Sequence, residues 1–323
     1  MKHHFFDIPE EKKIRLIINT DAKNEADDQY AIVHALLTPR FKVKGIIGAH
    51  FGNLRTDSSM EESYDEVNKI LRIMNLQDEI PTYKGAEREF LNEETPVFSE
   101  GAEFIINEAM KDDPLPLYVV FLGPITDMAA AYMKEPRIAE KLTTLWVGGG
   151  PWPEGGLEFN LMNDINAANV IFRSDIPLWV IPQNVYGEIR VSIAELAVNV
   201  KPYGEIGEYL FQQLLDFNFD MVNKHYLTMV ERAERKMTNA DSRLLAGLKH
   251  WPLGEVWSMG DSAVVSLLLD SQPNNFEMKP APRITKDMNY EHYQNERLIR
   301  WYNKVDSTFT MQDMYAKLKL HYG

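Results

Sequence analysis

The sequence predicts a single-domain α/β fold with a mostly parallel central sheet and helices on both faces. Short apolar runs bounded by polar, glycine or proline residues are typical of strands buried on both faces. Amphipathic helical patterns separate these runs, and such alternation predicts a mostly parallel sheet. No internal repeat or break in composition divides the chain, so we expect one domain over residues 1–323. The apolar runs are Ile14–Ile18, Val43–Ile47, Leu117–Leu122, Thr144–Val147 and Leu178–Ile181.

Apolar residues three and four positions apart predict helices within 31–36, 67–74 and 105–110. Later helices are predicted from Ile206 to about Glu234, over Ser262–Leu269 and, after a polar tail that begins at Asn275, near Met311–Leu320. Ligands of an open parallel sheet bind at the carboxyl ends of its strands. The segments directly after each apolar run are therefore where a functional site is expected.

The net charge of −14 and the absence of cysteine limit the possible functions. An acidic chain repels phosphate backbones and anionic membranes, so we expect neither nucleic acid nor a membrane as a partner. Without cysteine, the chain forms no disulfide, zinc–thiolate site, cysteine-ligated cluster or cysteine nucleophile. No apolar run approaches the ~20 residues of a membrane span, and the N-terminus lacks a signal-peptide pattern. We expect a soluble, cytoplasmic protein.

Three aspartates, Asp21, Asp27 and Asp28, lie between the first strand and the next helix. Carboxylates this close repel each other unless a cation neutralises them, and oxygen ligands suit calcium or magnesium. Helix capping is an alternative for Asp27 or Asp28, but it does not account for Asp21 at the end of a buried strand. An EF-hand does not fit, because Lys23 and Ala26 stand where a ligand and the turn glycine belong.

Polar and glycine residues also follow the next three runs. Asn53 lies after the second run, Thr126 after the third, and the triple glycine 148–150 directly after the fourth. Glycines at strand ends allow a ligand to approach the backbone closely. The triple glycine is not a phosphate loop, because no Gly-Lys-Ser/Thr follows it.

Further candidates lie in two later segments. Glu158 and Asn160 are two residues apart, so an extended segment would point both side chains the same way, toward sugar hydroxyls. A polar loop is the alternative for this pair. Asp261 precedes the apolar helix 263–269 and is either a helix cap or a remote metal ligand.

Taken together, these segments resemble the calcium-dependent nucleoside hydrolases, the inosine–uridine-preferring group. The loop 19–28 is similar to that family's Asp-x-Asp-Pro-Gly-x-Asp-Asp signature. The other similar segments occur in the family's order and span most of the chain. They are Pro81–Ala86, Leu122–Thr126, Gly148–Gly150, Glu158-Phe159-Asn160 with Asp164, and Asp261 before an apolar helix.

The resemblance implies that a calcium-bound water cleaves the N-glycosidic bond of a ribonucleoside or related N-riboside. The implied calcium ligands are Asp21, Asp28, the backbone carbonyl of Thr126 and Asp261, with Asp21 also the general base. The residues implied to bind sugar hydroxyls are Asp27, Asn53, Glu158 and Asn160. The ion would lower the pKa of the water, and the carboxylates would stabilise positive charge on the sugar ring. The resemblance also suggests a homodimer or homotetramer.

Several positions depart from the family's pattern. Asn19 replaces the first aspartate of the signature, and the loop after Asp21 is two residues longer. Gly260 stands where many members have a histidine that assists the departing base, and Trp152 lies near the place of an asparagine that often contacts the 5′-hydroxyl. His225 and Tyr226 lie in a helical region that we expect to close over the substrate. With no donor at Gly260, purine nucleosides that need acid assistance are expected to be poor substrates.

Three other classes of protein are alternatives, and a sequence feature argues against each. A non-catalytic sugar- or nucleoside-binding protein on the same fold would not need a general base. A metal-dependent glycosyltransferase would need a basic cluster for a nucleotide diphosphate, and none lies near these loops. A phosphatase of the haloacid dehalogenase type would need an aspartate two residues after Asp21, where Lys23 stands.

Overall fold

The computed structural model describes residues 5–220 and 255–323. Their main sheet has eight strands in the order β3-β2-β1-β4-β5-β6-β12-β9, all parallel except β9, which pairs antiparallel with β12. The predicted α/β class with a mostly parallel sheet is confirmed. The strands are β1 (Ile14–Thr20), β2 (Phe41–Gly48), β3 (Thr82–Lys84), β4 (Leu117–Phe121), β5 (Leu142–Val147), β6 (Leu178–Ile181), β9 (Phe276–Pro280) and β12 (Leu298–Tyr302).

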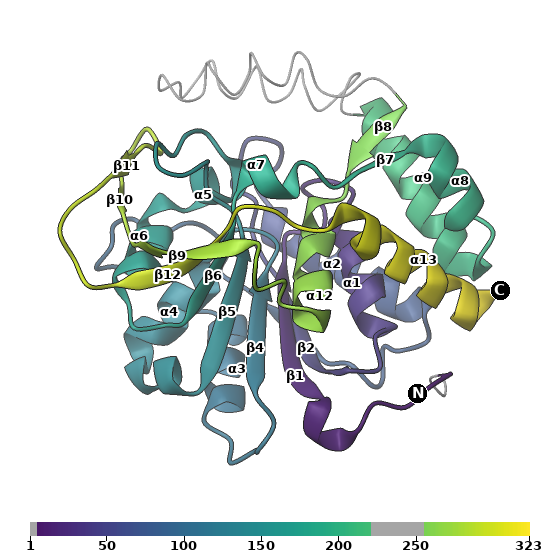
Figure 1. Cartoon of the computed structure of the whole chain (residues 1–323), viewed down its shortest axis with the longest axis horizontal. Coiled ribbons are helices and arrows are strands. Elements are labelled where there is room, and N and C mark those ends of the chain that lie inside the picture. The colour runs from purple at the N-terminus through teal and green to yellow at the C-terminus, as the bar shows by residue number, and fades with distance from the viewer. Residues whose placement is uncertain (1–4, 221–254) are drawn as a thin grey trace.

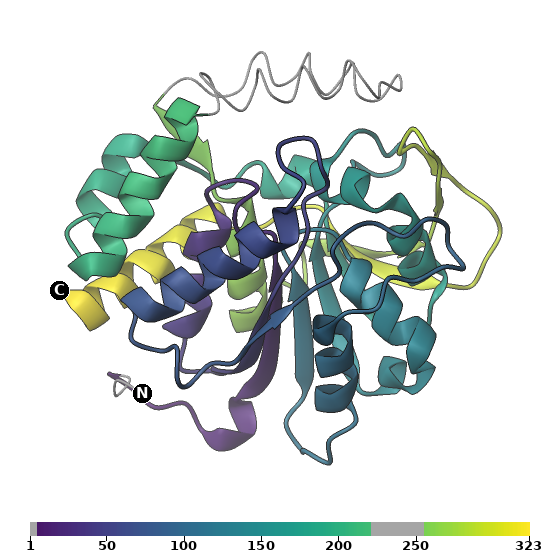
Figure 2. The same ribbon diagram turned by 180° about the vertical axis from the view of Figure 1, so that it is seen from behind.

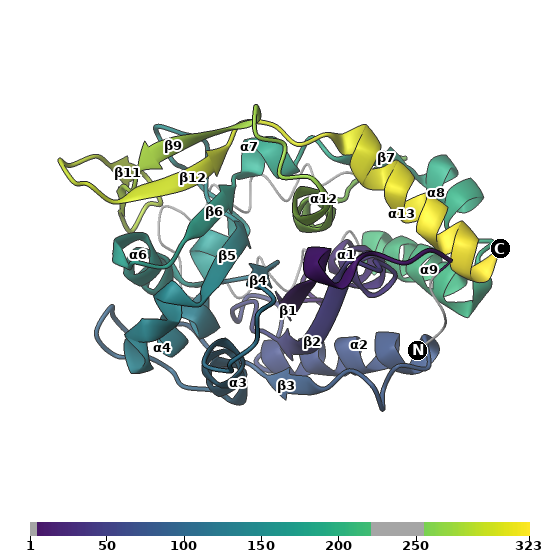
Figure 3. The ribbon, with the colours of Figure 1, turned by 60° about the horizontal axis from the view of Figure 1, so that its bottom comes forward.

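Helices cover both faces of this sheet, as Figures 1, 2 and 3 show from three sides. One apolar cluster joins one sheet face to α1 (Asp28–Leu36), α2 (Ser59–Ile73), α9 (Gly204–Asp220), α12 (Ala263–Leu269) and α13 (Ser307–Tyr322). A second cluster joins the opposite face to α3 (Glu100–Ala109), α4 (Thr126–Lys134) and α6 (Ile165–Arg173). The sheet is therefore buried between two apolar layers, as expected for parallel strands.

Shorter elements connect these layers. They are the helices α5 (Phe159–Asn163), α7 (Gln183–Tyr186) and α8 (Ile193–Asn199), the strands β7 (Arg190–Ser192), β8 (Val256–Ser258), β10 (Arg283–Ile284) and β11 (Tyr290–Glu291), and 3₁₀ turns at Glu10–Lys12, Pro136–Glu140 and Gly260–Ser262. No helix within residues 5–220 and 255–323 is long and apolar enough to cross a membrane.

Local sequence explains the central elements. All seven residues of β1 are buried, because this strand lies in the middle of the sheet with a covered face on either side. Helix α3 begins where the Ser99 side chain accepts the Ala102 N–H, and α6 begins where Asp164 accepts the Ala167 N–H. The sheet thus directs the loops after β1, β4 and β5 to one edge, where α5 and α7 also lie (Figure 1).

Candidate active site

The loops at this edge enclose a small polar cavity of about 30 Å³. A buried water needs roughly 10–15 Å³ of such space, so the cavity has room for an ion or a few waters between the side chains that line it. Most of the lining side chains are acidic or can bind a hydroxyl. The lining residues are Asp21, Asn24, Glu25, Asp27, Asp28, Leu122, Val147, Glu158, Phe159, Asn160, Tyr186 and Asp261.

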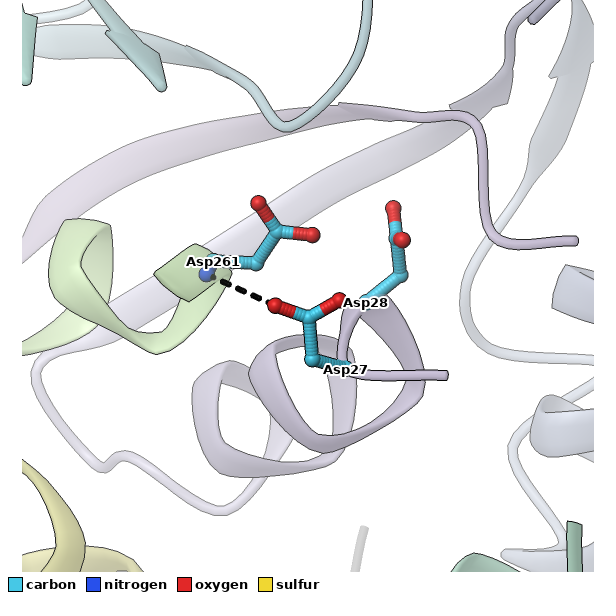
Figure 4. A group of neighbouring side chains, drawn as sticks. All are labelled: Asp27, Asp28 and Asp261. Carbon is cyan, nitrogen blue, oxygen red and sulfur yellow. Dashed lines mark hydrogen bonds between the residues drawn. The ribbon is translucent and has the colours of Figure 1, made fainter. Parts of the chain in front are cut away.

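Three buried aspartates come together although their segments are far apart in sequence. Asp27 and Asp28 stand at the start of α1, and Asp261 reaches toward them from the 3₁₀ turn Gly260–Ser262 (Figure 4). One carboxylate oxygen from each lies within 4.8 Å of the others, and the Asp261 N–H donates to Asp27 Oδ2 at 3.2 Å. A set of hard oxygen atoms at this spacing fits a calcium or magnesium ion.

The electrostatics of the cavity also favour a cation. Burial raises the pKa of Asp28 to about 6. Burial first, and then the neighbouring carboxylates, raise the pKa of Asp21, Asp27 and Asp261 well above the ordinary value. Each raised pKa means that burial and the neighbouring charges disfavour the ionised form, and a divalent cation offsets that cost. The side chains present therefore fit a metal ion.

Asp21 enters the cavity directly from the carboxyl end of β1. Its Oδ2 accepts a hydrogen bond of 3.0 Å from Asn24 Nδ2. The opposite side of its carboxylate packs on Gly123, where a Cβ atom would stand 2.7 Å from Asp21 Oδ1. The turn after β4 therefore needs glycine at this position, because a side chain would displace the carboxylate.

Thr126 is not among the residues that line the cavity. Its hydroxyl donates to Asp164 Oδ2 at 2.8 Å and also lies 2.9 Å from His50 Nε2. From the same turn, Leu122 lines the cavity instead, and its carbonyl accepts from Asn160 Nδ2 at 2.6 Å. Of the turn that sequence reasoning singled out, Leu122 lines the cavity and Gly123 packs against the Asp21 carboxylate.

Glu158 and Asn160 both line the cavity and are buried, at the start of α5. Asn160 uses its amide nitrogen to bind two carbonyls, those of Leu122 at 2.6 Å and Val147 at 2.8 Å. This leaves its Oδ1 as the atom that can accept from a ligand. Glu158 begins helix α5, and its carboxylate caps the N–H groups of Asn160 and Leu161.

Among the described residues, two that were proposed from the sequence to bind substrate, Asn53 and Trp152, are not in the cavity lining. Asn53 is exposed in the loop after β2. Trp152 packs its ring against Trp301 and His292, with centroids 5.5 and 4.6 Å apart. His225 and Tyr226 lie outside the residues that the structure describes.

Glu25 and Tyr186 are among the lining residues that sequence reasoning did not propose for the site. Burial raises the pKa of Glu25 to about 7, while the charge of Arg55 acts in the opposite direction. Glu25 lies within the lengthened part of the first loop, so the extra residues add a carboxylate to the cavity. Tyr186 follows β6, and a search after every strand end could have found it.

Tyr186 also explains why residue 260 is glycine. A Cβ atom on Gly260 would stand 2.5 Å from Cδ2 of the Tyr186 ring. The histidine that many family members have at this point would therefore collide with Tyr186. The Tyr186 ring on α7 fills the space that a side chain at residue 260 would need.

Asn19, which stands in place of the first aspartate of the signature, pairs with Asp127 in the structure. Asn19 Nδ2 donates to Asp127 Oδ2 at 2.7 Å, and both side chains are buried. The other oxygen of Asp127 accepts from the Ala86 N–H at 2.9 Å and from the Ser99 hydroxyl. The buried carboxylate of this pair is thus on α4, and the amide is on β1.

Asn19→Asp is therefore expected to destabilise the protein by about 3 kcal/mol, because it places a second buried carboxylate against Asp127. In the double variant Asn19→Asp/Asp127→Asn, the new amide can still accept from Ala86 and Ser99 with its oxygen and donate to residue 19 with its nitrogen. We expect it to be more stable than the single variant. Denaturant unfolding measures both, and equal stability of Asn19→Asp and wild type would show that the pair carries no buried charge.

Comparisons with known proteins agree with this geometry. The sequence profile described as inosine-uridine preferring nucleoside hydrolase matches residues 16–308. A probable uridine nucleosidase 2 from Arabidopsis thaliana is 26% identical over 246 residues, 67% of this chain and 72% of that protein. A pyrimidine-specific ribonucleoside hydrolase, RihA, from Salmonella arizonae is 25% identical over 218 residues, 59% of this chain and 67% of that protein.

Solved structures share the fold. A purine-preferring ribonucleoside hydrolase from Gardnerella vaginalis matches with a TM-score of 0.69 and 18% identity, covering 95% of this chain and 98% of that one. The plant nucleoside hydrolase PpNRh1 matches with a TM-score of 0.68 and 18% identity, covering 94% and 98%. With the profile match over most of the sequence, these findings show that the chain belongs to the inosine-uridine preferring nucleoside hydrolase family of N-glycosyl hydrolases.

Proposed function

We propose that this chain hydrolyses the N-glycosidic bond of a ribonucleoside or related N-riboside at the aspartate-lined cavity, with a calcium ion bound there. The observation that carries the proposal is the convergence of Asp27, Asp28 and Asp261 around one point, beside Asp21. A binding protein would need no such buried, mutually repelling carboxylates, which are costly to keep charged.

The residues have separate roles in this proposal. Asp21, Asp28 and Asp261 would hold the calcium ion together with a backbone carbonyl of the turn after β4. We expected that carbonyl to be Thr126, and the cavity lining now favours Leu122. When bound, the ion would lower the pKa of a water molecule and orient the sugar. Asp21 would accept the proton of the attacking water, because its carboxylate lines the cavity directly after β1, beside the proposed ion ligands.

The remaining lining groups would bind the sugar. A carboxylate oxygen of Asp27 lies close to those of Asp28 and Asp261, and Asn160 offers its Oδ1 from α5. Carboxylates around the ring would also stabilise the positive charge that develops as the bond breaks. For Asn53, Trp152, His225 and Tyr226, a contact with substrate stays a prediction from the sequence. We also propose a homodimer or homotetramer, which light scattering would test.

The relatives named above act on pyrimidine and on purine nucleosides, so the base has to be found by assay. No side chain at residue 260 can protonate a departing base. Substrates with good leaving groups should therefore react fastest, because they need no acid. In a panel of uridine, inosine and p-nitrophenyl riboside with calcium, we expect the nitrophenyl riboside to give the highest kcat/KM. Binding of these compounds without turnover of any of them would instead support a non-catalytic binding protein.

A further inference from the structure

The carboxylate of Glu158 has no free acceptor position in this structure. Oε2 accepts the N–H groups of Gly149 and Leu161, each at 2.8 Å. Oε1 accepts the Asn160 N–H at 3.0 Å and the Tyr186 hydroxyl at 2.8 Å. A carboxylate offers about four lone-pair sites, so all of them are used by the protein itself.

Three of these four donors are fixed backbone groups, and only Tyr186 is a side chain. The backbone donors belong to the turn after β5 and to the first turn of α5. These groups hold the carboxylate in place whether or not a ligand is present. A substrate hydroxyl could bind Glu158 only at the position that the Tyr186 hydroxyl takes.

Tyr186 is held in this position by its surroundings. Its ring packs on Gly260, where a Cβ atom would come within 2.5 Å of the ring. The Ile189 N–H donates to the Tyr186 carbonyl at 3.1 Å, and the Met259 N–H donates to the Ile189 carbonyl at 2.7 Å. These backbone bonds tie the end of α7 to the segment that precedes Gly260, so the ring and the glycine stay together.

A riboside presents three hydroxyls to the cavity. This inference rests on the proposed function, in which the ion and Asp27 bind the sugar, and there the 2′- and 3′-hydroxyls would lie at these two groups. The 5′-hydroxyl is the one that remains for the corner with Glu158. If Tyr186 keeps the last acceptor position there, the 5′-hydroxyl gains no charge-assisted hydrogen bond, which is the strong kind.

We propose that Tyr186 is a specificity-determining residue that withholds Glu158 from the 5′-hydroxyl, so that ribosides with a modified 5′ carbon are substrates as good as their 5′-hydroxyl counterparts. A site that binds a hydroxyl with a buried polar group strongly rejects an analogue without it. With Glu158 satisfied, the neutral Oδ1 of Asn160 is the acceptor left beside it, and a hydrogen bond to a neutral group discriminates less than one to a charged group. The substrate class therefore includes 5′-deoxy and 5′-substituted ribosides.

The test compares uridine with 5′-deoxyuridine, and p-nitrophenyl riboside with its 5′-deoxy analogue, in wild type and in Tyr186→Phe. For wild type, the ratio of kcat/KM between each 5′-hydroxyl substrate and its deoxy analogue should be below about tenfold. Tyr186→Phe keeps the ring on Gly260 and frees one acceptor on Glu158. The ratio should then rise by about tenfold or more, because a hydrogen bond to a charged group is gained.

Tyr302→Phe is the matched control, since its hydroxyl binds the Ser271 carbonyl at 3.0 Å and does not line the cavity. This control should keep the wild-type ratio. Calcium titration of Tyr186→Phe should give the wild-type Kd, which confirms an intact site. A wild-type ratio above a hundredfold, or an unchanged ratio in Tyr186→Phe, would overturn the inference. Failure of every protein to hydrolyse any of the four compounds would count against the proposed function itself.

Discussion

Asp21→Asn is expected to lower kcat by about 10²–10⁴, the usual contribution of a positioned general base. The introduced amide can keep the hydrogen bond to Asn24 through its oxygen, and its size matches the close packing on Gly123. The fold should therefore survive, while the group that accepts the proton of the water is lost. Steady-state turnover of p-nitrophenyl riboside at saturating calcium measures the effect.

Asp21 has two proposed roles, as ion ligand and as base, and excess calcium separates them. If the variant were slow only because it binds the ion weakly, raising the calcium concentration would restore turnover. We expect no such rescue. Asp65→Asn serves as the control, because Asp65 is an exposed carboxylate on α2 and does not line the cavity. Near-normal turnover of Asp21→Asn would show that another group activates the water.

The central sheet was predictable because its strands are buried on both faces. The five apolar runs read from the sequence lie in β1, β2, β4, β5 and β6, next to one another in the sheet. The strands that sequence reasoning missed are at or near its edges. β3 has only three residues, all partly exposed, and β9 is mostly exposed, so neither has the continuous apolar pattern of a central strand.

The site was predictable in part for a similar reason. The rule that ligands bind after parallel strands located Asp21, Glu158 and Asn160, and all three line the cavity. The rule cannot say which atom of a turn faces inward: the resemblance implied the Thr126 carbonyl as an ion ligand, whereas Leu122 of the same turn lines the cavity. It also cannot show that the Tyr186 ring fills the space beside Gly260, because that contact joins segments far apart in sequence. Such pairings depend on tertiary packing.

The fold also explains why the aspartates at the start of α1 could be mistaken for helix caps. Asp27 is the residue before α1, yet its side chain caps no N–H of that helix. It accepts instead from the backbone of Asp261. A cap and a metal-site residue share the same sequence position, and only the distant partner distinguishes them.

Asp28→Asn is expected to weaken calcium binding by more than about 10²-fold, since even groups that only support a metal ligand are worth 10–100-fold. The same change removes one negative charge from a group of buried, mutually repelling carboxylates, and burial has raised the pKa of Asp28 to about 6. Without calcium, the variant should therefore be at least as stable as wild type.

Calcium should reverse that order, because an ion that binds only the folded state stabilises it in proportion to the logarithm of its concentration over Kd. Thermal unfolding with chelator and with millimolar calcium gives the Tm of variant and wild type without and with the ion. Isothermal titration with calcium alone gives the affinity. Asp65→Asn, which loses an exposed carboxylate outside the cavity, should behave as wild type in both conditions. A wild-type rise in Tm with calcium in Asp28→Asn would remove Asp28 from the ion's ligands and place the cation elsewhere among the acidic groups of the cavity.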